Sequence, residues 1–257
     1  MRLYVVDSFT ETPFSGNPAG VVLLDSPAPE EWMRSVAAEL KHAETAFVVL
    51  DGTEPKPLRW FTPTTEVDLC GHATLATAHV LGGEQRFGTR SGELVCTDAG
   101  DGWIGMDFPA SPPSPVDAPA DLAAALPGIE VREVLASPQR LLVRAAGPEQ
   151  VRALVPDLAR IAAWPYRGAV VTARGDREGV DFVSRFFAPA AGIPEDPVTG
   201  SAHCQLAPYW AAELGRGGEL VGEQVSARGG FVRAEPRGER VALRGRAVTV
   251  LAGELRV

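Results

Sequence analysis

The feature that most constrains the fold of this chain is an internal repeat. Residues 59–63 read Arg-Trp-Phe-Thr-Pro and residues 185–189 read Arg-Phe-Phe-Ala-Pro, an offset of 126. Two further pairs follow in the same order: Gly-His-Ala at 71–73 with Gly-Ser-Ala at 200–202, and Arg-Ser-Gly at 90–92 with Arg-Gly-Gly at 228–230. Three matches in one order indicate an internal duplication. The alternative is that strand–turn–helix segments of one chain merely look alike.

The length agrees with a duplication, because 257 residues suffice for two domains of about 125 residues each. Residues 109–119 contain five prolines, which exclude a helix or a central strand, so this stretch is the expected interdomain linker. The expected domains are therefore 1–112 and 113–247. Hydrophobic patterns predict strands at 3–6, 19–24, 46–50 and 59–61, and helices at 30–40, 71–81, 121–126, 148–154 and 201–214.

Composition excludes several classes of protein. The formal net charge of −9, without a cluster of Lys or Arg, argues against a nucleic-acid-binding surface. No apolar run approaches the roughly 20 residues of a membrane-spanning helix, and the first residues lack the order of regions that marks a signal peptide. Three cysteines without framework spacing favour a reducing compartment. These features predict a cytoplasmic protein.

The repeat also predicts a binding site. Gly71 and Gly200 each begin a predicted helix, where first-turn amides have no intrahelical partners and the helix dipole adds partial positive charge. A glycine at this position lets an anion approach the backbone closely. Two such helix starts that face one cleft can hold a small carboxylate without Lys or Arg, so the acidic composition is compatible with an anionic substrate.

Four motifs connect the chain to a known family. They are Ser-Gly-Asn-Pro at 15–18, Glu-Thr-Ala-Phe at 44–47, Asp-Leu-Cys-Gly-His-Ala-Thr at 68–74 and Glu-Asp-Pro-Val-Thr-Gly-Ser at 195–201. In this order they resemble the PhzF-type phenazine-biosynthesis isomerase family, essentially over the whole chain. The resemblance implies an α+β fold like that of diaminopimelate epimerase. In that fold two similar domains each wrap a curled, mostly antiparallel, barrel-like sheet around a central helix. The resemblance also implies a last strand, at about 248–257, that returns to the first domain, an active site in the cleft between the domains, and a homodimer.

The resemblance assigns roles to individual residues. It places Glu44 as the catalytic acid/base, and a carboxyl group shielded from water is suited to proton exchange near neutral pH. It gives His72 a substrate hydrogen bond through a neutral imidazole, lets Asp196 order the site, and lets Ser201 contact substrate. The remaining expected substrate-binding residues are Gly71, Gly200, Thr199, Asn17 and Asp7.

Each of these residues also has a plain structural interpretation. Glu44 is near a helix end, where a surface carboxylate is common, and His72 can simply pack against its neighbours. Asp196 precedes a proline, as turn residues do, and Ser201 is a routine residue for a helix start.

The histidines give no metal-binding pattern. His79 follows His72 on the same helix face but about 10 Å further along the axis, and His42 and His203 complete no ligand spacing. The sequence therefore predicts no metal and no cofactor.

Cys70 raises the alternative of racemase chemistry, because diaminopimelate epimerase and its racemase relatives use two opposed cysteines. Cys70 occupies the first of these positions, but Thr199 occupies the second and cannot act as a thiolate, and Cys204 is five residues further on. As the family resemblance implies, we expect an isomerase that shifts a proton on a small carboxylate, such as a cyclic amino-acid-like metabolite. The alternatives are an epimerase or racemase, and a non-catalytic small-molecule-binding protein.

Overall fold

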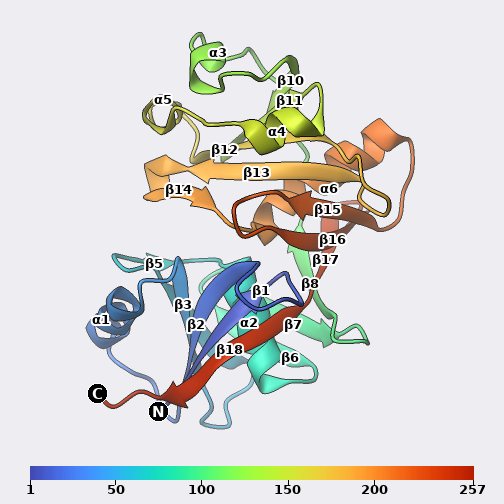
Figure 1. Cartoon of the computed structure of the whole chain (residues 1–257). Coiled ribbons are helices and arrows are strands. Elements are labelled where there is room, and N and C mark those ends of the chain that lie inside the picture. Colours follow the sequence, from blue (N-terminus) through green and yellow to red (C-terminus); the bar gives the residue numbers. More distant parts are fainter. The chain divides into compact units, whose positions relative to one another are not determined.

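The computed structural model describes all 257 residues and contains two compact units (Figure 1). Unit 1 comprises Met1–Asp107 and Arg244–Val257, and unit 2 comprises Phe108–Leu243. The chain leaves unit 1 within β8 (Ile104–Pro109) and returns within β17 (Arg240–Gly245). The sequence placed these divisions at 112/113 and near 248.

The proline-rich stretch 109–119 lies wholly inside unit 2 and is not a linker between the units. Within it, β9 (Ser114–Pro115) pairs antiparallel with β10 (Val131–Ala136) at the edge of the sheet. A proline is tolerated on an edge strand because its missing N–H faces away from the ladder. The composition of the stretch therefore marks an edge of the sheet.

The strands of unit 1 form one curled sheet whose hydrogen-bonded pairs are mostly antiparallel. Only β2–β3 and β4–β6 are parallel. In spatial order the strands are β18 (Ala247–Glu254), β1 (Arg2–Ser8), β2 (Asn17–Leu24), β3 (Glu44–Val49), β4 (Lys56–Phe61), β6 (Gln85–Thr89), β7 (Gly92–Asp98) and β8, with β5 (Glu66–Val67) on β4.

Unit 2 repeats this topology for the seven strands from β18 to β7 and for the short β5. Its parallel pairs, β11–β12 and β13–β15, occupy the same two places in the order. The strands are β9, β10, β11 (Arg140–Ala145), β12 (Gly168–Arg174), β13 (Phe182–Ala188), β15 (Leu220–Gln224) and β16 (Gly230–Arg237), with β14 (Ile193–Asp196) on β13. The shared pairing pattern confirms two similar domains of α+β class.

An ion pair explains why the Arg-aromatic repeat occurs twice. In unit 1, Arg59 forms two parallel bonds to Glu66, Nε–Oε1 at 2.7 Å and Nη2–Oε2 at 2.6 Å. In unit 2, Arg185 does the same to Glu195, at 2.7 and 2.9 Å. Bidentate pairs of this kind are among the stronger side-chain interactions because both bonds are charge-assisted. Each pair ties a long strand to the short strand that precedes the buried helix.

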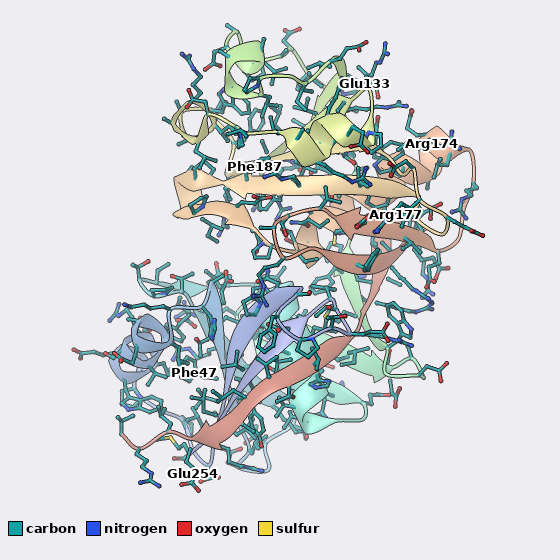
Figure 2. All side chains as sticks on the ribbon, in the orientation of Figure 1. Phe47, Glu133, Arg174, Arg177, Phe187 and Glu254 are labelled. Carbon is teal, nitrogen blue, oxygen red and sulfur yellow. The ribbon has the colours of Figure 1, made fainter.

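One helix of each unit is buried against the sheet (Figure 1). Helix α2 (Gly71–Leu81) packs on β1, β2, β3 and β18, and its residues 71–78 are buried on every side. Helix α6 (Gly200–Leu214) packs on β15 and β16. Small Gly, Ala and Thr side chains in α2 let the strands approach on all sides. Large side chains such as Phe47 in unit 1 and Phe187 in unit 2 fill the cores (Figure 2).

The other helices are short or lie at the surface of their unit. Helix α1 (Glu30–Leu40) has the bounds expected from sequence and buries Met33, Val36 and Ala37, whereas Trp32 and Leu40 are only partly buried. The remaining helices are α3 (Leu122–Ala125), α4 (Pro148–Ala153) and α5 (Leu158–Ala162), the last of which the sequence pattern did not predict. Among all these helices, none has both the length and the apolar character required to cross a bilayer.

Candidate active site

In unit 1 three predicted or suspected residues gather where β3 and α2 begin; we call Glu44, Cys70 and His72 the Glu44 cluster. Glu44 is the first residue of β3, Cys70 is the N-cap of α2, and His72 lies in the first turn of that helix. Oε2 of Glu44 is 3.5 Å from Nε2 of His72, and Sγ of Cys70 is 3.5 Å from Nδ1 of the same ring. The imidazole thus lies between a carboxylate and a thiol.

Burial fixes the charge state of His72. Its side chain is 7% exposed, and burial, reinforced by the charge of His42, lowers its pKa from 6.5 to about 3. The imidazole is therefore neutral at physiological pH, despite the neighbouring carboxylate. Nε2 of His72 makes no hydrogen bond, and Oε2 of Glu44 lies 3.5 Å from it. The hydroxyl of Ser8 donates to the backbone oxygen of His72 at 2.8 Å and holds this first turn in place.

The Glu44 cluster is also the one set whose donor atoms could share an ion, since these atoms lie within 4.8 Å of one another. Sequence spacing missed this set because Glu44 comes from a separate strand. The geometry is poorly suited to a single metal, because Sγ lies beside Nδ1 and the carboxylate lies beside Nε2. One ion binds only one nitrogen of a ring. The expected absence of a metal stays a prediction.

Asp7 and Asn17 lie on neighbouring strands at the base of the loop that joins β1 to β2. Both are buried, and Asn17 is paired opposite Ser8. Oδ2 of Asp7 accepts a hydrogen bond of 2.7 Å from the backbone N–H of Phe14, whose φ of 69° is left-handed. Asp7 therefore stabilises an unusual loop conformation, and its expected contribution to substrate binding stays a prediction.

In unit 2 the predicted Asp196 and Thr199 are joined by a residue that sequence reasoning missed, Gln224; we call these three the Asp196 cluster. Thr199, the N-cap of α6, donates its hydroxyl to Oδ2 of Asp196 at 2.5 Å. Gln224 accepts from the N–H of Thr199 at 2.8 Å and donates to the backbone oxygen of Asp196 at 2.6 Å. All three side chains are buried. The network rigidly holds the chain that leads into α6.

A second missed residue, Arg140, contacts the predicted Ser201. Nη2 of Arg140 donates to Oγ of Ser201 at 2.8 Å. Arg140 begins β11 and is 61 positions from Ser201 along the chain, so no local motif reveals the pair. An arginine therefore lies beside the start of α6, and the expectation that an anion is held there without Lys or Arg stays a prediction.

The structure thus brings the predicted residues together in two groups. Glu44 and His72 lie at the start of α2, beside Gly71, and Asp196, Thr199 and Ser201 lie at the start of α6, beside Gly200. Cys70 and Thr199 are the N-caps of these two helices and occupy equivalent positions in the two units. Each group combines buried polar side chains with free first-turn amides, which is an arrangement suited to anions and proton transfer.

A duplicated curled sheet around a buried helix, with polar groups at both helix starts, defines the class of epimerase-like folds. A solved structure of a probable proline racemase from Agrobacterium radiobacter K84 has this fold, with a TM-score of 0.63 over 100% of this chain and 93% of that chain. At 9% identity, the likeness concerns the fold alone.

The family is more specific. Residues 6–253 match the family model described as phenazine biosynthesis-like protein (PhzC-PhzF), and the chain belongs to this family. An uncharacterized isomerase of Pseudomonas aeruginosa is 48% identical over 100% of this chain and 99% of its own length. The crystal structure of a PhzF family protein from Enterococcus faecalis is 40% identical, with a TM-score of 0.94 over 100% and 99% of the two chains. These relatives support an isomerase or epimerase type of activity.

Replacement of Cys70 tests the racemase alternative. The second position holds Thr199, whose hydroxyl is bonded to Asp196, so a two-thiol mechanism has no second thiol there. We expect Cys70→Ala to keep most of the turnover and to lose roughly 1 kcal/mol of unfolding free energy through a small cavity. Denaturant unfolding and turnover check this, with Cys96→Ala, another buried thiol in unit 1, as the control. Complete loss of turnover in a normally folded Cys70→Ala protein would instead indicate that the Cys70 thiol acts as a base.

Proposed function

We propose that this protein is an isomerase that shifts a proton on a small carboxylate-bearing metabolite, with Glu44 as the single acid/base and without a metal or organic cofactor. The observation that carries the proposal is the Glu44 carboxylate, 13% exposed, facing the neutral imidazole of His72 at 3.5 Å. A carboxylate in a poorly hydrated site is a competent base for a carbon-bound proton. Elemental analysis of the purified protein checks the absence of metal.

The surroundings of Glu44 suit the chemistry of such a shift. When a proton leaves carbon beside a carboxylate or carbonyl group, negative charge develops on oxygen. The unpaired first-turn amides of α2 and its helix dipole stabilise that charge. Neutral His72 supplies a hydrogen bond without competing for the proton, because its lowered pKa keeps it uncharged.

A single base favours a shift over a stereoinversion. Inversion at one carbon requires two groups on opposite faces of the substrate, whereas one carboxylic acid can return its proton to another carbon on the same face. The position equivalent to Cys70 is Thr199, which is hydrogen-bonded and does not titrate. The proposed reaction is therefore the movement of a double bond by proton transfer.

We further propose that the first turn of α6 contributes to substrate binding through Gly200, Ser201 and the order provided by Asp196. The family resemblance likewise suggests a homodimer, which light scattering of the purified protein tests.

The proposal is tested by hydrogen exchange. The protein is incubated in heavy water with a panel of cyclic and amino carboxylates, and deuterium incorporation is followed by proton NMR. We expect deuterium at two carbons of a substrate whose double bond has moved. Exchange at a single stereocentre, with loss of optical activity, would indicate a racemase. A ligand that binds measurably but never exchanges would indicate a binding protein.

A further inference from the structure

Arg140 is a cation that makes no hydrogen bond to a carboxylate. The hydrogen bonds of its guanidinium go only to Ser201: Nη2 to Oγ at 2.8 Å and Nη1 to the backbone oxygen at 3.4 Å. Its Nε is buried without a hydrogen-bond partner. Burial lowers the pKa of Arg140, more than the nearby Cys204 and Asp196 raise it. A largely buried charge without a directly bonded counter-ion is costly, and Asp196 compensates it only in part, so an anion that binds here is stabilised.

Arg144 shows what a compensated arginine looks like on the same strand. It is four residues further along β11 and therefore on the same face. Its Nη1 is 3.6 Å from Oε2 of Glu133 and is bonded to the carboxylate of Glu213 (Glu133 is labelled in Figure 2). Arg144 thus contacts two carboxylates directly, whereas the hydrogen bonds of Arg140 go to neutral oxygens only.

The bond to Arg140 also determines what Ser201 can do. Because Oγ of Ser201 accepts from Arg140, its own hydrogen must point elsewhere, and no hydrogen bond within the protein uses it. A hydroxyl that accepts from a charged group becomes a better donor, since successive hydrogen bonds polarise one another. Ser201 is partly exposed, so this donor is open to a ligand.

The backbone of the same turn has the matching property. The N–H of Thr199 is bonded to Gln224 and that of Ala202 to the oxygen of Thr199, and no side chain caps the helix. The amides of Gly200 and Ser201 are thus the first-turn donors left over. With the hydroxyl of Ser201 and the charge of Arg140 behind it, the start of this 15-residue helix forms an anion site.

We propose that Arg140 is the positioning residue of this site: it sets Ser201 as a hydrogen-bond donor and supplies the positive charge that retains the carboxylate of the substrate. The proposal rests on the proposed function only in taking the anion to be the substrate's carboxylate. The sequence led us to expect that backbone amides alone hold the anion. In the proposed site the cation of Arg140 also contributes, through the hydroxyl of Ser201.

The test is a titration of the full-length protein with sodium acetate at constant ionic strength, followed through the amide NMR signals of Gly200 and Ser201. Wild-type protein is expected to show saturable shifts. Arg140→Met is expected to weaken acetate binding by roughly tenfold to a hundredfold, as for loss of a charged hydrogen bond. Arg140→Lys keeps the positive charge but lacks the planar guanidinium with its several N–H donors, so it should retain part of the affinity for acetate. Arg144→Met, the matched control, should bind like wild type.

Two further variants separate the role of Arg140 from a folding defect and from the proposed role of Glu44. Ser201→Ala removes the donor with Arg140 intact and should also lose acetate binding, which keeps the test valid if Arg140→Met folds poorly. Glu44→Gln should bind acetate normally, so failure of the proposed acid/base chemistry is distinguishable. Once a substrate is identified, Arg140→Lys should raise KM by a larger factor than it lowers kcat. Unchanged acetate binding in Arg140→Met, or an equal loss in Arg144→Met, would overturn the proposal.

Discussion

Replacing Glu44 by glutamine is expected to lower turnover by about 10²–10⁴-fold, the usual contribution of a general acid–base group. Glutamine has the same shape and can still face Nε2 of His72, but it cannot accept and return a proton. Folding should be retained, because His72 is neutral and no buried charge loses its partner. Deuterium incorporation and turnover in the same sample measure the effect.

A matched control distinguishes loss of the base from loss of a charge. Glu39→Gln removes one carboxylate from the exposed side of α1 in the same unit and should leave turnover unchanged. Glu44→Asp keeps a carboxyl group one methylene shorter, so it should retain part of the activity that glutamine loses. Near-normal turnover in Glu44→Gln would remove Glu44 from the mechanism and leave the isomerase class to be explained by another base.

The duplication could be predicted from sequence because it depends on residues that act locally. Arg59 and Arg185 each pair with a glutamate within ten residues along the chain, so the ion pair and its motif are contained in one short segment. Helix starts marked by Gly71 and Gly200 are equally local. The prediction that the proline-rich stretch is a linker was wrong, because proline excludes a central strand but permits an edge strand. Composition alone does not distinguish an edge strand from a linker.

The polar groups of the site could be predicted only in part, for the same reason. Gly71 and His72 adjoin in the sequence, but the approach of Glu44 depends on β3 starting beside α2. Arg140 and Gln224 lie on strands that are distant in sequence from Ser201 and Thr199. A single polar residue within an apolar strand is typical of any half-buried strand, so neither residue stands out in the sequence. Contacts of this kind require the sheet order, which hydrophobic periodicity does not supply.

Acidification is expected to destabilise the protein strongly through two buried histidines. Burial lowers the pKa of His72 from 6.5 to about 3 and that of His203 from 6.5 to about 4. Below pH 6.5 the two histidines are protonated in the unfolded chain but stay neutral in the folded protein. The free energy of unfolding therefore falls as the pH falls. The decline continues until the folded pKa is reached. Between pH 7 and pH 5 each histidine should remove roughly 2 kcal/mol.

His203 allows this contribution to be isolated away from the Glu44 cluster. Its Nδ1 donates to the backbone oxygen of Thr199 at 2.9 Å, and its Nε2 is buried without a partner, so a second proton has no acceptor. The amide of His203→Asn can make the Thr199 bond without titrating. We expect the loss of unfolding free energy between pH 7 and pH 5, measured by urea titration, to be roughly 2 kcal/mol smaller in this variant. An identical pH dependence in both proteins would show that His203 is protonated in the folded state, which its buried Nε2 argues against.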